Sequence, residues 1–468
     1  MSVKAILRSD FLNEFRKSKV GVAGVVVLFF LVAMSIYAAT SVPLDSFRQW
    51  NNPSYWIKYP KSAMPSWTNI FASKKQPEHL IMNKPIITSQ LDEGIRTVKY
   101  AYKFAFNYDF FPSDFMINYG VRYNSTPPLV DVELIRPDGE SLAIISTSLP
   151  SAQSSQYIFR DTIFSTESEI KDNLRNYINK YSYAADVTRP EIMLFSDRDK
   201  PSVLKGTYTL IQTFSFFDEK GNDKVVSSEF ILGGKVYGLL GTDEFRHDLS
   251  IGILWGTPVA LFIGLSVAIV STFVGLTYGL VAAYRGRKTE PGLMMVVQII
   301  INIPTLFILI ILSITIGRSI FLIVGFFILF GWVGMALISR SMGLQIKTYT
   351  YIEAAKLMGE SDIRIIFRHI IPQLLPFAFA IIALSVPSAI LGESGLSFLG
   401  LGDPTIPTWG KILYDAQSSD AAARGMWWWI LPPGIMIGIT GAAFVLIARA
   451  LESIVNPKMI DPKMKQKV

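Results

Sequence analysis

The sequence predicts a polytopic α-helical membrane protein that carries a mostly β domain between its first two spanning helices. Three observations lead to this fold class. Half of the 468 residues are hydrophobic and only 17% are charged, compared with roughly 25% charged residues in soluble domains. Several apolar runs are long enough to cross a bilayer. One long polar segment with strand periodicity separates the first run from the second.

The apolar runs each contain about 20 residues with few or no charges, which is the length that a spanning helix needs. A large soluble protein with buried helices is the alternative, and the number of long runs in one chain argues against it. The first run is too long for the apolar region of a signal peptide, about 7–15 residues, so we interpret it as an uncleaved anchor. The six predicted transmembrane helices are residues 20–39, 256–284, 292–316, 320–338, 374–392 and 427–448.

Lys and Arg residues flank the predicted spans unevenly. They are frequent before the first span and after the second, fourth and sixth, and scarce in the remaining short loops. The positive-inside rule therefore places both termini in the cytoplasm. We expect a multi-pass protein of the plasma (cell or inner) membrane. Its expected parts are a cytoplasmic segment at 1–19, a first span at 20–39, an extracytoplasmic insert at 40–237, a five-helix core at 238–450 and a cytoplasmic tail at 451–468.

The insert has the alternation of apolar and polar residues that is typical of β-strands. In residues 97–109 alternate apolar side chains, from Val98 to Phe106, would share one face. Two hairpins are predicted, around the turn-forming sequences 136–140 and 218–223. The chain has no cysteine, so this domain must be held together by packing rather than by disulfides.

One helix is expected to interrupt these strands, at residues 165–182. Ser165 is its predicted N-cap, and acidic residues follow in the first turns. Asn124 opens an Asn-Ser-Thr triplet, a weak glycosylation signal because such triplets occur often by chance.

No catalytic or metal-binding pattern is found in the sequence. The three histidines are scattered, and there is no metalloprotease, nucleophile-elbow or Walker A motif. We therefore expect a chain that is not an enzyme and binds no cofactor or metal itself. The net charge of +7 does not indicate a nucleic-acid partner, because the basic residues lie beside apolar stretches. The scarcity of acids and histidines inside the spans argues against an ion-coupled secondary transporter.

The loop at 351–376, after the fourth span, predicts a helix–turn–helix elbow. A short helix ends at Gly359, which can adopt the left-handed conformation. Ser361 or Asp362 can cap a second helix, and Pro372 and Pro376 end it before the fifth span. An apolar stripe is expected on this second helix, formed by Ile363, Ile366, Phe367 and Ile370.

This loop resembles the EAA loop of ABC importer permeases, in particular the C-type permeases of the dipeptide/oligopeptide ABC importer family. The match consists of Glu353-Ala354-Ala355, Gly359 and Pro372, with Ile371 as a mild departure from the family pattern. In that family the loop forms the coupling helices that dock into the ATPase. The resemblance assigns ATPase coupling to Glu353, Ala354, Ala355, Gly359, Ser361, Asp362, Arg364 and Pro372.

Further segments resemble the same family. Residues 239–248 precede the second span, 393–402 follow the fifth, and 407–410 match at the expected distance. The residues of this outer motif are Gly241, Thr242, Asp243, Asp248, Glu393 and Gly395. Arg246 and His247 stand where the family usually has Gly and Arg. The resemblance covers about residues 11–39 and 238–458, and it leaves out the insert, which in most members is a short loop.

The resemblance implies a six-helix permease of the type I ABC importer kind that moves di- or oligopeptides. The implied partners are a B-type permease, two ATPases that hold ATP and Mg, a substrate-binding protein and membrane lipids. Di- or oligosaccharides and nickel are alternative substrates. A membrane-anchored extracellular sensor is the alternative from another class, but it would need no coupling elbow. The insert could dock the binding protein, cover the partner permease, bind ligand or only stabilise the outer face.

Overall fold

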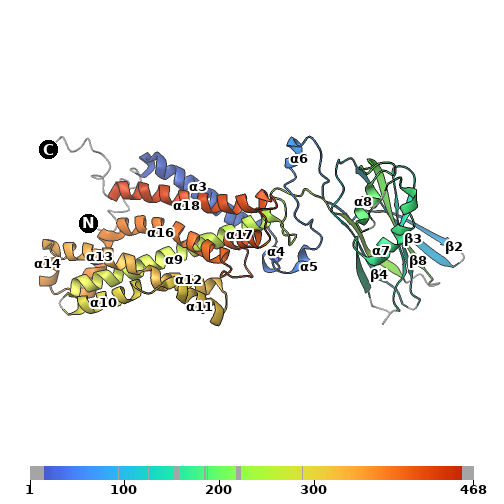
Figure 1. Ribbon diagram of the computed structural model, residues 1–468. Helices are drawn as coiled ribbons and strands as arrows, with labels where there is room; N and C mark the ends of the chain where they lie inside the picture. The colour runs from blue at the N-terminus through green and yellow to red at the C-terminus, as the bar shows by residue number, and fades with distance from the viewer. Residues whose placement is uncertain are drawn as a thin grey trace. The chain divides into compact units, whose positions relative to one another are not determined.

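The computed structural model describes residues 15–92, 94–124, 126–151, 158–183, 186, 188–217, 223–286 and 288–455. The chain divides into two compact units, a helical one and a β-rich one (Figure 1). The helical unit consists of Met1–Asn51 with Ile251–Val468, and the β unit is Asn52–Ser250. The expected insert, 40–237, differs from these bounds at both ends. Much of the predicted N-terminal segment and tail, 1–14 and 456–468, lies outside the described residues.

The helical unit contains the predicted spans. Five helices in the described part of the chain are long and apolar enough to cross a membrane, or six if a bent pair counts as one span. The protein is therefore a polytopic α-helical membrane protein. The long helices are α3 (Lys19–Ser41), α9 (Leu249–Arg285), α12 (Ile320–Gly331) followed directly by α13 (Val333–Ile346), α16 (Ile371–Phe398) and α18 (Trp427–Val455). Shorter helices in this unit are α4 (Leu44–Arg48) and α17 (Trp409–Ser418).

The bent pair occupies the predicted third span, 292–316. It consists of α10 (Thr289–Ile301) and α11 (Thr305–Thr315), whose axes differ by 69°. The prediction of one continuous helix is therefore wrong. Pro304 explains the break, because it has no N–H to donate to the preceding turn and disfavours helical backbone at the residue before it.

Helix α18 packs between α16 and α3. The first span lies close to α18 because Gly24 has no side chain: a Cβ there would lie 2.7 Å from the carbonyl oxygen of Ala443. Only 17% of the apolar window of α3 is buried. Such exposure of an apolar helix fits a position at the lipid-facing edge of the unit.

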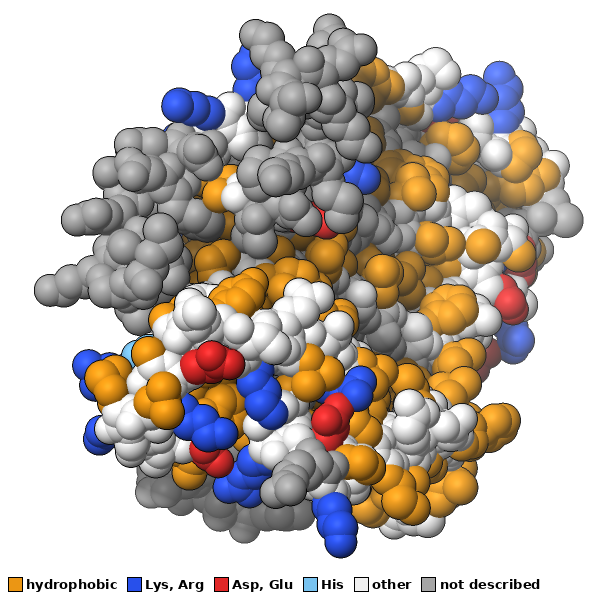
Figure 2. Space-filling view, turned by 90° about the vertical axis from the view of Figure 1, so that its left-hand side faces the viewer, with side chains coloured by type: hydrophobic (Ala, Val, Ile, Leu, Met, Phe, Trp, Pro, Cys, Tyr) orange, Lys and Arg blue, Asp and Glu red, His pale blue; other side chains and the backbone are white. Residues whose placement is uncertain are grey.

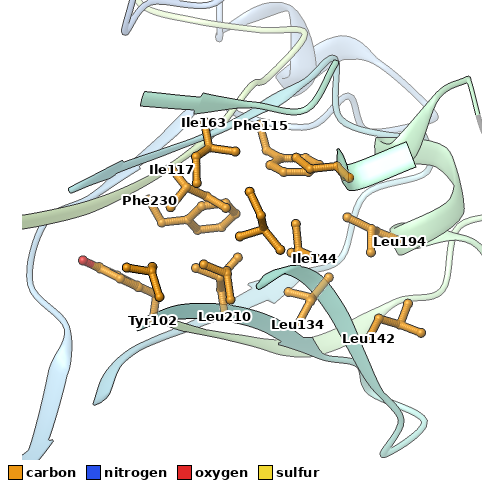
Figure 3. Packing of buried hydrophobic residues seen from close by; sticks show 14 of the residues in the cluster. Tyr102, Phe115, Ile117, Leu134, Leu142, Ile144, Ile163, Leu194, Leu210 and Phe230 are labelled. Atoms are coloured by element: carbon orange, nitrogen blue, oxygen red, sulfur yellow. The ribbon is translucent and has the colours of Figure 1, made fainter. Parts of the chain in front are cut away.

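The β unit is a sandwich of two antiparallel sheets. One sheet has the strand order β1-β9-β4-β7, and the other has β2-β3-β8-β5-β6. Apolar side chains from both sheets meet between them, among them Phe115 and Phe230 from one side and Leu134 and Leu210 from the other (Figure 3). The strands are β1 (Leu80–Met82), β2 (Ile86–Asp92), β3 (Ile95–Phe106), β4 (Phe115–Arg122), β5 (Leu129–Ile135), β6 (Ser141–Ser148), β7 (Ile158–Phe164), β8 (Gly206–Phe216) and β9 (Lys224–Leu232).

The first predicted hairpin is confirmed and the second is wrong. Strands β5 and β6 pair around the turn at 136–140, where the Arg136 N–H donates to the Glu140 carbonyl at 2.8 Å. In contrast, β8 pairs with β3 and β5, whereas β9 pairs with β1 and β4 in the other sheet. A polar, Gly-containing connection between two strand patterns therefore joined two facing sheets here rather than two neighbouring strands.

The predicted helix at 165–182 is shorter than expected. It consists of α7 (Ser168–Arg175) and the 3-10 turn η1 (Ile178–Lys180). Ser165 is not its N-cap, because the helix begins at Ser168 and Glu167 is in the N-cap position. The Ser165 N–H is instead bonded to the Phe115 carbonyl of the sheet. Three more short helices belong to this unit: α5 (Pro53–Trp56), α6 (Thr68–Phe71) and α8 (Pro190–Phe195). Asn124 is exposed, and its glycosylation stays a prediction.

Candidate functional site

The loop after α13 folds into the predicted elbow. Helix α14 (Thr350–Leu357) ends at Gly359, whose φ is +81°. The Glu360 N–H donates to the Ala355 carbonyl at 3.2 Å, and the Gly359 N–H donates to the Lys356 carbonyl at 3.0 Å. These two hydrogen bonds form a Schellman helix end, which glycine favours because it has no Cβ. Helix α15 (Asp362–Ile365) follows, with Ser361 in the N-cap position.

The second helix of the elbow does not end at Pro372. It continues through the π-helical turn η2 (Ile366–Ile370) into α16, so that one helical stretch runs from Asp362 to Phe398. The expected break at Pro372 and Pro376 is therefore wrong. Pro372 lies in the first turn of α16, and the wider π turn before it accommodates the missing N–H. The elbow is thus a direct extension of a spanning helix.

The inner face of the elbow is packed against the spanning helices. Ile352 and Ala355 of α14 share one buried cluster with Ile365, Ile366 and Ile370. Their neighbours in that cluster include Leu276, Leu280 and Tyr284 of α9 and Met335 of α13. This cluster differs from the predicted stripe, since Ile366 and Ile370 are buried but Ile363 and Phe367 face outward. The elbow is therefore packed directly against α9, α13 and α16.

The outer face of the elbow is an exposed surface with apolar and charged groups. Leu357 is 88% exposed, Met358 75%, Ile363 63% and Phe367 54%. A surface cleft beside them is lined by Ile363, Arg364, Phe367, Arg368 and Pro372. Figure 2 looks at the end of the helical unit at which α14 lies, where hydrophobic, basic and acidic side chains are exposed together. Exposed apolar patches of this kind, rimmed by charges, are typical of protein-binding surfaces.

The elbow residues predicted from the sequence lie partly on the packed inner face and partly on the exposed outer face. Ala355 is buried, and Gly359 provides the turn. Glu353 is exposed, and among the described residues no hydrogen bond or ion pair holds its carboxylate. The remaining exposed residues are Ala354, Ser361, Asp362 and Arg364.

Two side-chain contacts brace the elbow, and sequence reasoning missed both. His369 Nε2 lies 2.9 Å from Glu360 Oε2, and Gln373 Nε2 donates to the Tyr351 hydroxyl at 2.6 Å. The Tyr351–Gln373 contact joins α14 to α16, and the Glu360–His369 contact joins the residue after Gly359 to the π turn η2. The spacing of Tyr351 and Gln373 gave no local signal, because these two residues meet only when the chain reverses at Gly359.

The outer motif before the second span belongs to the β unit. Thr242 is fully buried, donates to the Pro60 carbonyl at 2.7 Å and accepts from the Ala63 N–H at 3.0 Å. Asp243 accepts from the N–H groups of Phe245 and His247, and its Oδ2 lies 2.7 Å from His247 Nδ1.

Residues 59–66 and 235–248 lie side by side, joined by the parallel bridge between Met64 and Val236. We call these two stretches the neck of the β unit. Gly241 has a φ of +75°, and Asp248 accepts from the Ser250 N–H. The motif thus holds the neck together.

The motif after the fifth span packs the end of α16 against α17. Glu393 is buried and accepts from the Ser397 hydroxyl at 2.6 Å and from Thr408. Gly410 lets α17 approach α16, because a Cβ there would lie 2.6 Å from the Ser394 Cα. Gly395 is exposed with open space around it. Glu393 therefore ties the end of α16 to the start of α17.

A cavity of about 370 Å³ lies between α9, α12–α13 and α16. Its lining is apolar apart from Ser271, Thr272, Ser385 and Ser388. The Ser271 hydroxyl is buried and has no hydrogen-bond partner among the described residues. Sequence reasoning named no pore-lining residues. The available signal was hydroxyl side chains at isolated positions within otherwise apolar spans. No group of His, Asp or Glu side chains suited to a metal ion occurs in the described part of the chain.

Spanning helices, an elbow continuous with one of them, and a cavity between them that is apolar apart from four hydroxyl groups are the features of a membrane transport subunit. Comparison with known proteins agrees. Residues 275–461 match the model of the family described as binding-protein-dependent transport system inner membrane component. This stretch includes the elbow and excludes the β unit.

Named relatives give the same result. The dipeptide transport system permease protein DppC of Bacillus subtilis (strain 168) is 33% identical over 220 residues, which are 47% of this chain and 68% of that protein. The oligopeptide transport system permease protein OppC of Haemophilus influenzae is 34% identical over 226 residues, 47% and 71% of the two chains. A putative peptide transport system permease protein of Brucella suis is 35% identical over 222 residues, 47% and 74%. The chain belongs to this family of permeases, as the EAA motif predicted.

Proposed function

We propose that this chain is one of two permease subunits of an ATP-driven importer of di- or oligopeptides. The observation that carries the proposal is the two-sided elbow: its inner face is fixed to α9, α13 and α16, and its outer face offers exposed apolar side chains to a partner. The peptide substrate is suggested by the relatives, which are named for dipeptide and oligopeptide transport.

The proposed assembly has a second, B-type permease beside this chain and two ATPase chains beneath the elbow. Both termini lie in the cytoplasm, and α10 with α11 completes a set of six spans. The β unit then lies outside the cell, where a substrate-binding protein can dock on it. The chain itself hydrolyses no ATP and binds no ATP or Mg, which are held by the ATPases.

Each part of the site has a role in this proposal. Leu357, Met358 and Phe367 seat the elbow in a groove of the ATPase. Because α15 continues into α16, movement of the elbow reorients α16 and changes the cavity that it lines. The hydroxyls of Ser271, Ser385 and Ser388 offer weak hydrogen bonds to a peptide in transit, which a path that must also release its cargo requires.

The test is ATP-driven uptake in proteoliposomes that contain this chain and its copurifying subunits. Labelled dipeptides and oligopeptides are compared with a disaccharide and with nickel ions. Phe367→Ala is the elbow variant, and Phe321→Ala is the matched control because Phe321 is 72% exposed on α12, away from the elbow. Loss of a central apolar anchor costs about 1–2 kcal/mol of binding, so we expect roughly tenfold weaker ATPase association.

We expect peptide uptake that needs ATP and that Phe367→Ala reduces more than Phe321→Ala does. Purification of the chain without any ATPase, or equal uptake by both variants, would refute the coupling role of the elbow. Uptake of only the disaccharide or nickel would retain the importer and replace the substrate.

A further inference from the structure

Strand β9 in the β unit is paired along only part of one of its edges. On one side, β4 pairs with β9 from Lys224 to Leu232, with a bulge near Val225. On the other side, β1 pairs only with Phe230, Ile231 and Leu232. Residues 224–229 of β9 therefore have no neighbouring strand on that side in the described part of the chain. A free edge of this kind exposes main-chain N–H and C=O groups that can pair with another strand.

A cleft of about 650 Å³ lies along this free edge. Residues 225–229 of β9 are all in its lining. Asn83 and Pro85, which follow the end of β1, and Ile87 of β2 line it as well. The cleft therefore begins where β1 stops, and it extends from the free edge of β9 across β4 and β7, which contribute Asn118, Tyr119 and residues 160–162 to its lining. Its volume lies within the range of about 300–1,000 Å³ that is usual for small-ligand sites.

The polar groups of the cleft are incompletely satisfied. Lys58 Nζ and Glu229 Oε2 lie 2.6 Å apart, and Asn118 Nδ2 donates to the same Glu229 oxygen at 3.1 Å. The other amide atom, Asn118 Oδ1, is buried without a hydrogen-bond partner among the described residues. A buried acceptor without a partner costs free energy, and a ligand that brings an N–H into the cleft would remove this cost. Arg160 and Asp161 add one charge of each sign to the lining.

We propose that this cleft binds a short peptide in extended form, added as a strand to the free edge of β9. Main-chain hydrogen bonds to β9 would supply the affinity, as in other cases of strand addition. At about 3.4 Å per residue, the five lining residues of β9 match a peptide of about five residues. The identity of this peptide as transported substrate rests on the proposed function.

The dimensions favour a free peptide over a protein surface as the occupant. A stable protein–protein interface covers about 800 Å² on each partner, whereas the unpaired part of β9 is six residues long and is limited by the end of β1. The cleft is also polar enough to bind main chain rather than only apolar side chains. Strand addition is indifferent to most side chains, which fits a carrier of varied peptides.

The test uses the full-length chain in lipid nanodiscs and a fluorescent pentapeptide of alternating Val and Thr with free termini. A second probe has the same sequence with alternate amide nitrogens methylated, which removes main-chain donors. Asn118→Leu removes the orphan acceptor, and Val226→Trp fills the cleft from β9. Lys103→Ala is the matched control, since Lys103 is exposed on β3 and is not part of the lining. Thermal unfolding of each variant checks that the β unit remains folded.

We expect the unmethylated probe to bind, and the methylated probe to bind at least tenfold more weakly. Asn118→Leu and Val226→Trp should also weaken binding at least tenfold, and Lys103→Ala should not change it. Equal affinity for the two probes, absence of binding up to millimolar peptide, or insensitivity to both cleft variants would overturn the proposal. Loss of self-association in these variants, without peptide binding, would assign the edge to a second copy of the chain and would equally overturn it.

The uptake experiment is independent of this one. ATP-driven peptide uptake without binding in the cleft would leave the proposed function standing and remove this inference. Binding in the cleft with no ATP-driven uptake would leave this inference standing and remove the proposed function.

Discussion

Replacing Gly359 by alanine isolates the contribution of one backbone conformation to the elbow. Gly359 has a φ of +81°, and a Cβ built there would meet no atom within 4 Å. The substitution therefore adds no clash, and its cost comes only from the left-handed backbone. That conformation costs an L-residue roughly 1–2 kcal/mol. Alanine recovers about 0.4–1 kcal/mol by restricting the unfolded chain. The expected net loss is about 1 kcal/mol.

The matched control is Gly395→Ala. Gly395 also has open space at its Cβ position, but it lies inside α16 with helical backbone. Alanine is favoured over glycine in a helix by about 0.5–1 kcal/mol. The two alanine variants should therefore differ by about 2 kcal/mol in the free energy of unfolding, although neither contacts anything new. Gly359→Asn should fall between them, because asparagine tolerates the left-handed region better than alanine.

The measurement is unfolding of the full chain in mild detergent with increasing SDS, followed by far-UV circular dichroism, together with ATPase stimulation in the assembled complex. We expect Gly359→Ala to lower both the unfolding free energy and the stimulation, and Gly359→Asn to lower them less. If Gly359→Ala and Gly395→Ala change stability equally, the positive φ does not control the elbow and the reasoning above is wrong.

Three further predictions concern buried polar groups. Burial lowers the pKa of His79 to about 4 from its ordinary value of 6.5, so the folded β unit prefers the neutral ring. The free energy of unfolding of the β unit should therefore be unchanged above pH 6.5. It should fall by up to about 3 kcal/mol as the pH drops to 4. His79→Gln should flatten this profile in urea titrations, and an unaltered profile would contradict the assignment. Arg136→Leu should destabilise the β unit by about 2–4 kcal/mol, because the buried guanidinium donates to the Tyr181 hydroxyl and the Ser196 carbonyl; a loss no larger than that of the exposed control Lys103→Ala would argue against it. Glu393→Gln should retain uptake whereas Glu393→Ala should lose much of it, because an acceptor for Ser397 is what the site needs; equal loss in both variants would instead indicate a role for the charge.

The sequence predicted features that depend on local patterns. Apolar length identified the spanning helices, and Gly359 marked the turn of the elbow, because both signals lie within a few residues. The break between α10 and α11 was missed although Pro304 is visible, since proline also occurs within spanning helices such as α18. Pro372 was predicted to end a helix, but the π turn before it accommodates the missing N–H, and the helix continues.

Features that depend on distant pairing could not be predicted. The connection after β8 looked like a hairpin, because local patterns do not specify which sheet the next strand joins. The contact between Tyr351 and Gln373, the unpaired hydroxyl of Ser271 and the free edge of β9 all arise from the tertiary fold. The family resemblance supplied the function of the elbow, and it supplied nothing about the β unit, which it does not cover.

The neck of the β unit would allow the sandwich to be deleted from the chain without separating the segments on either side of it. Its two stretches, 59–66 and 235–248, run together, so the chain leaves the sandwich beside the point at which it enters. A short Gly-Ser bridge could therefore join the two stretches after excision of everything between them, with little loop-closure entropy to overcome. By the same geometry, a foreign domain with adjacent ends could replace the sandwich at the neck.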